Sequence, residues 1–415
     1  MRDAGRGCLP DPARKAHWIA MTSNPSGDGF TRGFDQLPPQ AYEPDPALAG
    51  YPPPQPTQLG PASYHPGTPP QPYGYPNAYP PPPFPQARPI SALPNGPRAY
   101  HQMLRGPLYR WWKPLLCLVL VLLFAAIMMA LAIIPVIIAG MIVGAPDLGE
   151  YARRTADIAN LGPIGFIYVN LGLIALIPAS GLSIWIVHGI RPRFLSSVAG
   201  GIRWRWLLRC VAVILPLWAV YVGLAALVTP SDSSRPDHWA ALLIIVLLLT
   251  PLQAAGEEYF FRGWIMQNVG AWFARPMVGL LISVAVSAVV FATVHLSRDP
   301  WLWGSIACVA VASGLAAWRT GGLEDGIVIH SVNNVLALIV ALIYGGWSQT
   351  FVRTDSSGTP MMLVLAVAVN GIALGLIVWQ AKRAGLQPYY QPLGQQVNPT
   401  GYPPAPASPV TQYPR

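Results

Sequence analysis

Long apolar stretches alternate with short polar ones through the middle of the chain. Each stretch approaches the ~20 residues that a helix needs to cross a bilayer, and helices are expected because lipid cannot satisfy an open backbone. The pattern predicts an all-α, polytopic bundle of eight transmembrane helices. They are expected at Leu115–Val143, Leu161–Val187, Leu207–Val228, Trp239–Ala255, Met277–Val294, Trp301–Trp318, Gly326–Tyr344 and Met361–Trp379.

Polar residues interrupt this pattern at three places. They are, in chain order, Glu257, Glu258 and Arg262, then His295, then His330 and Asn334. An ionisable side chain at membrane depth costs at least ~2.5–3.5 kcal/mol on insertion scales, so a functional role is its default interpretation. If the three groups meet in the fold, they form one intramembrane site.

The first group predicts two carboxylates with different roles. Neighbouring helical residues point ~100° apart, and the i,i+4 spacing of Glu258 and Arg262 favours an ion pair along one face. Glu257 is then free to face a cavity, where apolar surroundings disfavour its charged form and suit it to general-base catalysis. The alternative is an ion pair that only joins two helices.

The other two groups are ambiguous when taken alone. His330 and Asn334 are spaced i,i+4 and share a helix face, where both can donate hydrogen bonds to an oxyanion. They could equally bridge helices, at ~0.6 kcal/mol per hydrogen bond. His295 follows Phe291 by one turn, and a lone histidine near a helix end is often only interfacial.

Composition separates the membrane region from two tails. The 415 residues are 53% hydrophobic and only 10% charged, against about 25% charged in soluble domains. Most of the 47 prolines lie before residue 107 or after residue 387, so we expect disordered tails at 1–106 and 386–415. The tails either bind cytoplasmic partners or are solvated without a specific partner. Met21 opens a polar stretch typical of native N-termini, which favours residues 1–20 being a start-site artefact.

The positions of the positively charged residues along the chain suit a membrane surface and argue against nucleic acid as a partner. Lys and Arg flank the apolar stretches instead of interleaving with aromatic residues. By the alternation of spans, fourteen of them lie on one side. The other side has five, namely Arg153, Arg154, Arg235, Arg298 and Arg353. The positive-inside rule therefore predicts a multi-pass protein of the cell membrane with both termini in the cytoplasm.

Several other chemistries are excluded by the absence of their motifs. The sequence has no HExxH pair for a zinc protease, no Gly-x-Ser-x-Gly elbow and no phosphate-binding loop. The four cysteines are far apart and predict neither a disulfide framework nor a zinc site.

Three motifs resemble those of the CAAX protease and bacteriocin-processing (CPBP) family. This family of intramembrane peptidases includes the eukaryotic type II CAAX prenyl endopeptidase. The motifs are Glu257-Glu258-x-x-x-Arg262, Phe291-x-x-x-His295 and His330-x-x-x-Asn334. The resemblance covers about residues 240–345, and it is specific because all three motifs occur in order within apolar stretches.

The resemblance implies an intramembrane endopeptidase that cleaves near the end of a membrane-associated substrate. Glu257 and His295 would activate a water, and His330 and Asn334 would stabilise the oxyanion. Glu258, Arg262 and Phe291 would support these groups. The family has been described both as metalloproteases and as metal-independent glutamate peptidases. Glu257, His295 and His330 could bind zinc with an open fourth position, but Asn is a poor zinc ligand, which favours a metal-independent enzyme.

The resulting division of the chain has five parts. They are the N-terminal tail 1–106, N-terminal transmembrane helices 107–238, a CPBP-like peptidase core 239–345, a last transmembrane helix 346–385 and the C-terminal tail 386–415.

The alternative function is a non-catalytic scaffold or bacteriocin-immunity protein whose polar cluster is structural. A proton-coupled transporter is a third physical option, but no internal repeat supports it.

Simple alternation of the spans raises one geometric difficulty. It places Glu257 and His330 near the cytoplasmic side but His295 near the outer side, ~27 Å away along the fifth helix. A fourth helix that continues past Arg262 to about Trp272 would bring Glu257 level with His295. The seventh helix would then have to be tilted or displaced to bring His330 to the same depth.

Overall fold

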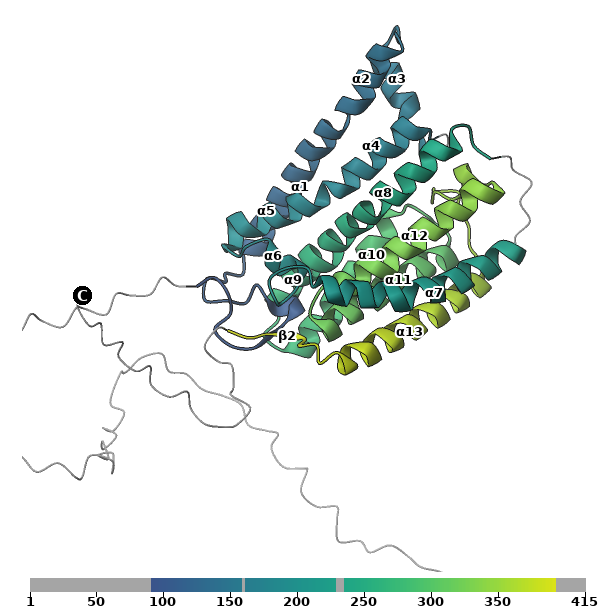
Figure 1. Cartoon of the computed structure of the whole chain (residues 1–415). Coiled ribbons are helices and arrows are strands. Elements are labelled where there is room, and N and C mark those ends of the chain that lie inside the picture. Colours follow the sequence, from purple (N-terminus) through teal and green to yellow (C-terminus); the bar gives the residue numbers. More distant parts are fainter. Residues whose placement is uncertain (1–90, 159–160, 229–234, 393–415) are drawn as a thin grey trace, which may run out of the picture. The chain divides into compact units, whose positions relative to one another are not determined.

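The computed structural model describes residues 91–158, 161–228 and 235–392, which lie within one unit, Pro83–Arg415. Their regular structure is almost entirely helical (Figure 1). The helices are α1 (Lys113–Ala132), α2 (Ile134–Ile142), α3 (Leu148–Thr155), α4 (Pro163–Ile174), α5 (Leu176–His188), α6 (Arg193–Ser196), α7 (Trp204–Val228), α8 (Trp239–Glu258), η4 (Tyr259–Ile265), α9 (Met266–Trp272), α10 (Pro276–Val294), α11 (Pro300–Thr320), α12 (Glu324–Tyr344) and α13 (Pro360–Arg383). Two short 3-10 helices, η2 (Tyr100–Gln102) and η5 (Trp347–Gln349), and two strands, β1 (Arg98–Ala99) and β2 (Tyr389–Tyr390), complete the set.

Eight helical runs in the described part of the chain are long and apolar enough to cross a membrane, which confirms the predicted all-α bundle. Some spans combine consecutive helices: α1 with α2, α4 with α5, and α8 through η4 to α9. Pro135 lies at the start of α2, where a proline interrupts the backbone hydrogen bonds of the preceding turn.

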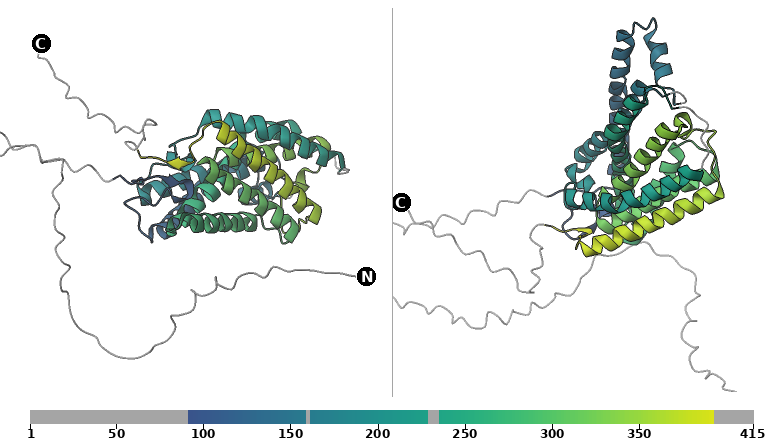
Figure 2. Two further views of the ribbon diagram at one scale, coloured as in Figure 1. Left: turned by 90° about the horizontal axis from the view of Figure 1, so that it is seen from below. Right: turned by 45° about the vertical axis from the view of Figure 1, so that its right-hand side comes forward.

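The helices α8, α10 and α12 lie between α4 on one side and α7 and α13 on the other (Figure 1). α12 packs against both α8 and α7, and α4 packs against α8. In the further views of Figure 2, α7 and α13 again lie together along one edge of the bundle. All three polar motifs therefore lie on inner helices.

The fourth span does not end at Ala255, as its hydropathy predicted, but runs from Trp239 to Trp272. Its middle turns, Tyr259–Ile265, form a π-helix. Charged residues after Ala255 resemble a helix end in sequence, yet Glu258 and Arg262 are fully buried within the bundle. The extension to Trp272 that the depth argument required is confirmed.

Part of the predicted N-terminal tail is folded. Tyr100, Met103 and Leu104 are almost completely buried, and β1 pairs antiparallel with β2 from the start of the C-terminal tail. The expectation of disorder is therefore wrong for residues 91–106, because aromatic and apolar residues within this Pro-rich stretch find a packing surface. Residues 1–90 and 393–415, including the proposed start-site segment 1–20, lie outside the described residues.

Gly256 sets the distance between α8 and α4. A Cβ atom there would overlap the carbonyl oxygen of Leu173 in α4, so only glycine permits this approach directly before Glu257. Around Gly375 in α13, by contrast, nothing lies within 4 Å of an added Cβ atom.

We predict that Gly256→Ala lowers the free energy of unfolding by about 1–3 kcal/mol, because overpacking forces α4 and α8 apart. The matched control Gly375→Ala should be neutral or stabilising by up to about 1 kcal/mol, since alanine suits a helix interior better. Thermal unfolding of both variants in detergent measures the difference. Equal effects of the two substitutions would contradict the close approach.

Candidate active site

A buried ion pair lies where α8 passes into the π-helix. Arg262 Nη1 is 3.2 Å from Glu258 Oε1, and neither side chain has any exposed surface. This confirms the pair predicted from the i,i+4 spacing. Glu258 Oε2 also lies against Gly326 of α12, where a Cβ atom would be only 2.7 Å away. The small residue lets α12 approach the carboxylate.

The Arg262 guanidinium has a second partner in an aromatic ring. Its central carbon lies 4.3 Å from the ring centroid of Phe291 on α10, within the range of a cation–π contact. None of the three guanidinium nitrogens has a hydrogen bond of good geometry. The positive charge of Arg262 is therefore stabilised by Glu258 and by the ring face of Phe291. This contact gives the aromatic residue of the second motif a physical role.

The π-helix is stabilised from the neighbouring α10. Ser287 Oγ donates a hydrogen bond to the carbonyl oxygen of Phe261, at 2.9 Å. π-helical turns are rare and often occur at functional sites, because they shift the side chains that follow around the helix. Here the π-helix begins directly after Glu258.

His330 lies between the two carboxylates. Its Nδ1 atom is 3.1 Å from Glu258 Oε1, and its Nε2 atom is 3.5 Å from Glu257 Oε2. Arg262 and two ionised carboxylates sum to one negative charge, so the four-residue cluster is neutral only when both ring nitrogens of His330 carry a proton. Neutrality is favoured because an unbalanced buried charge is strongly destabilising.

Glu257 has a partner that the sequence analysis missed. Gln253 Nε2 donates to Glu257 Oε1 at 2.6 Å, so a neutral amide contacts the carboxylate that faces the cavity. Asn334 Nδ2 in turn points at Gln253 Oε1, at 3.5 Å. Gln253 is placed i−4 from Glu257, and this spacing on a predicted helix was the signal that could have identified it.

The amide network continues beyond the predicted residues. Asn333 Nδ2 donates to Asn334 Oδ1, and Trp218 Nε1 of α7 donates to Asn333 Oδ1, both at 3.1 Å. Each donor in this chain of contacts points towards Glu257. Sequence reasoning could not identify Trp218, because it lies on a helix that no motif includes.

His295 caps the end of α10. Its Nδ1 atom lies 2.7 Å from the carbonyl oxygen of Phe291, and a carbonyl only accepts, so Nδ1 carries the proton. The Nε2 atom then keeps its lone pair and can act as a base. The next residue, Leu296, has φ +65°, a left-handed conformation that is costly for a bulky side chain and typical of functional sites.

The predicted catalytic residues line one cavity of about 630 Å³, within the range of ligand-binding sites. Glu257, His295, His330 and Asn334 all contribute to its wall, together with mostly apolar side chains. Within the described residues, Glu257 contacts His330 directly, and no hydrogen bond or ion pair joins it to His295.

The depth difficulty is resolved by a turn that lies inside the bundle. Glu257 precedes Trp272, the end of α9, by about 22 Å of helix, whereas His330 follows Glu324 by only about 9 Å. The α11–α12 turn must therefore lie about 13 Å deeper than the end of α9. Its residues agree with this position, because Thr320, Glu324 and Asp325 are completely buried.

The three candidate metal ligands do not form a ligand set here. No group of three His, Cys, Asp or Glu side chains in the described ranges is arranged to hold one metal ion. Glu257 and His330 are adjacent, whereas no hydrogen bond or ion pair among the described residues joins His295 to either of them.

Comparison with known proteins finds a family model that matches part of the chain. Residues 238–336 match the model of the type II CAAX prenyl endopeptidase Rce1-like family, which confirms the resemblance indicated by the three motifs. The chain is also 28% identical over 151 residues to the uncharacterized protein YyaK of Bacillus subtilis (strain 168). This match covers 34% of the chain and 50% of YyaK. No solved structure matches the chain.

We predict that Arg262→Ala lowers the free energy of unfolding by about 3–5 kcal/mol, because it leaves Glu258 as an uncompensated buried charge. The matched control is Arg154→Ala, which breaks an exposed i,i+4 pair with Glu150 in α3 and should cost about 0.3–0.5 kcal/mol. Thermal unfolding in detergent gives both values. A small loss for Arg262→Ala would show that the buried pair does not hold the helices.

Proposed function

We propose that the protein is an intramembrane endopeptidase, which hydrolyses a peptide bond near the end of a membrane-associated polypeptide. The observation that supports this most directly is that Glu257, His295, His330 and Asn334 line one cavity among membrane-spanning helices. The Rce1-like match over the same residues supports peptidase chemistry.

In this proposal Glu257 and His295 activate the attacking water. Both residues line the cavity without contacting each other, so a water can bind between them. The Nε2 lone pair of His295 or the ionised carboxylate of Glu257 accepts its proton as the oxygen attacks the scissile carbonyl. The proton then passes to the leaving amine.

His330 and Asn334 supply hydrogen-bond donors to the oxyanion. Both lie on one face of α12 beside Glu257, in a site of low dielectric where such donors stabilise developing charge strongly. Glu258 accepts from His330 Nδ1, which orients the Nε2 atom towards the cavity. Gln253 positions Glu257 and Asn334 relative to each other.

We also propose that both termini lie in the cytoplasm of a cell whose membrane the protein spans. Arg262 must be removed from the earlier count of flanking charges, because it is completely buried. Thirteen Lys and Arg residues then remain on the side of the two tails, against five on the other. The positive-inside rule is still satisfied.

We predict that Glu257→Gln reduces peptide cleavage by at least about 10²-fold, because the amide cannot take the proton of the water. Gln has the shape of Glu, so the variant should fold. Mass spectrometry of membrane-protein termini, in cells with the native protein or the variant, detects the uncleaved substrate. The control Glu150→Gln, on exposed α3, should process normally. Normal processing in Glu257→Gln would instead support a scaffold or immunity protein.

Gln253→Met is expected to lower kcat about 10- to 100-fold with little change in KM, because it removes the contacts that position Glu257 and Asn334. Gln253→Glu should move the acidic limb of the pH–rate profile to higher pH, since a second carboxylate disfavours ionised Glu257. The control Gln267→Met, on the same span as Gln253, removes a buried amide that donates to the carbonyl oxygen of Phe194 in α6. It should leave kcat and the pH–rate profile unchanged. Kinetics on the identified substrate measure all three variants. An unshifted pH–rate profile in Gln253→Glu would show that residue 253 does not contact the catalytic carboxylate, and this result would exclude the proposed role of Gln253 in positioning Glu257.

A further inference from the structure

The catalytic cavity reaches only one end of the bundle. Consecutive spans alternate in direction, so the described connecting residues 143–158, 161–162, 235–238, 295–299 and 345–359 share one end, which we call the loop face. The other end, with residues 91–112, 189–203, 273–275, 321–323 and 384–392, is the tail face. Every described connecting residue that lines the cavity belongs to the loop face: Ile158, Leu161, His295, Leu296, Thr350, Phe351 and Val352. The described tail-face residues contribute none.

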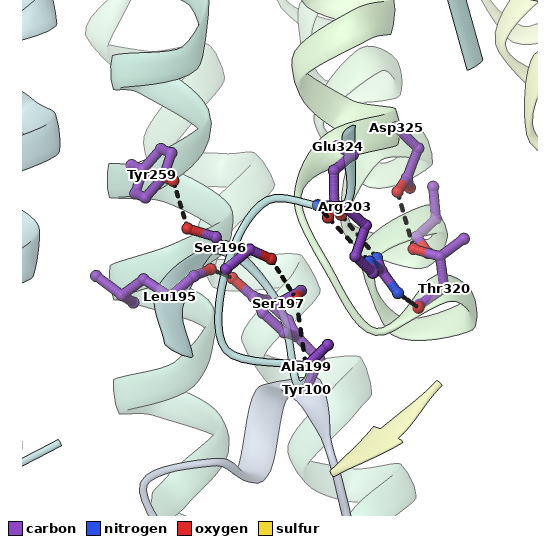
Figure 3. Close-up of polar contacts among 12 residues, drawn as sticks. Tyr100, Leu195, Ser196, Ser197, Ala199, Arg203, Tyr259, Thr320, Glu324 and Asp325 are labelled. Carbon is purple, nitrogen blue, oxygen red and sulfur yellow. Dashed lines mark hydrogen bonds and ion pairs between the residues drawn. The ribbon is translucent and has the colours of Figure 1, made fainter. Parts of the chain in front are cut away.

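A layer of polar contacts lies at the tail face (Figure 3). Arg203 Nη2 pairs with Glu324 Oε2 at 2.7 Å, and Arg203 Nη1 donates to the carbonyl oxygen of Thr320 at 2.7 Å. On the neighbouring side, the hydroxyl groups of Ser196 and Tyr259 lie 2.5 Å apart. These contacts fix the segment after α6 against the α11–α12 turn and the π-helix.

Backbone hydrogen bonds add to this layer. The amide of Val198 donates to the carbonyl of Gly321, and the amide of Leu323 donates to the carbonyl of Ser196, at 2.8 and 2.9 Å. Tyr100 reaches the layer from the N-terminal segment and donates to the carbonyl of Leu195. A smaller hollow of about 390 Å³ lies beside Ser196 and Tyr259, but it shares no lining residue with the catalytic cavity.

Charge places the two ends relative to the cell. The tail face has thirteen flanking Lys and Arg residues and the loop face five, so the tail face is cytoplasmic. The cavity therefore opens on the opposite side of the membrane. The C-terminus of a substrate that approached from the cytoplasm would meet the polar layer of the tail face instead of the cavity.

We infer that the cavity admits its substrate from the non-cytoplasmic face, as an extended apolar segment of a membrane-anchored or translocated polypeptide. Phe351, Leu302 and Ile306 line the cavity and suit apolar side chains of a substrate. The identity of the occupant as a peptide rests on the proposed function, whereas the access side rests on the cavity, the polar layer and the charge distribution.

Cysteine labelling with a small, charged, membrane-impermeant thiol reagent tests the access side without requiring catalysis. The background has Cys8, Cys117, Cys210 and Cys308 changed to Ala. Val352→Cys probes the mouth of the cavity and Thr250→Cys its buried wall. Leu248→Cys, on the same helix but 64% exposed on the outer surface of the bundle, is the matched control. Arg191→Cys marks the tail face.

In intact cells we expect labelling of Val352→Cys and Thr250→Cys, with Thr250→Cys reacting at least about 10-fold faster than in inside-out vesicles. Arg191→Cys should react only in the vesicles, and Leu248→Cys in neither preparation. Faster labelling of Thr250→Cys from the vesicle exterior, or none from either side, overturns the inference. Ile306→Cys, on another wall of the cavity, replaces Thr250→Cys if that variant does not fold.

The substrates that accumulate in Glu257→Gln test the second half of the inference. Their cleavage sites should lie at or beyond the non-cytoplasmic ends of apolar segments. Cleavage sites at cytoplasmic C-termini would overturn it. If Glu257→Gln accumulates no substrate, the proposed peptidase function fails, while the labelling result still decides the side on which the cavity opens.

Discussion

The burial of Arg262 constrains the centre of this protein more than any other contact. Its guanidinium has no exposed surface, and its charge is stabilised by Glu258 on its own span and by the ring of Phe291 on α10. His330 of α12 approaches the same Glu258 carboxylate. Because breaking a buried pair is strongly destabilising, α8, α10 and α12 cannot shift independently without losing a partner of this cluster.

This constraint also explains why Glu257 is available for chemistry. The neighbouring carboxylate, Glu258, satisfies the buried cation, and Glu257 points about 100° away along the helix. It therefore meets the cavity, with His330 on one side and Gln253 one turn before it. Two adjacent glutamates in one helix thus separate a structural charge from a candidate base, and the tie through Gln253 extends the same fixed geometry to Asn334.

Local features of this fold could be predicted from sequence, whereas features that depend on distant partners could not. Apolar length predicted the eight spans, and i,i+4 spacing predicted the Glu258–Arg262 pair. The extension to Trp272 was obscured because hydropathy cannot show that a charge is compensated inside a bundle. The embedded α11–α12 turn depends on Arg203, which precedes Glu324 by 121 residues, and no pattern within either segment indicates that contact. Disorder was wrongly predicted for residues 91–106, because the composition of the whole Pro-rich tail hides the few side chains, such as Tyr100 and Met103, that pack against the bundle.

An intramembrane hydrolase must bring water and a polar backbone to mid-membrane without opening a leak between the two aqueous sides. A cavity open at both faces would provide a continuous path for ions past Glu257 and His330. In the proposed access route, the contacts of Arg203 with Glu324 and Thr320 close one face, so that water would enter from the other face alone. The layer that holds the start of α12 sets the depth of His330, and in the proposed access route the same layer would also keep the membrane sealed below the site.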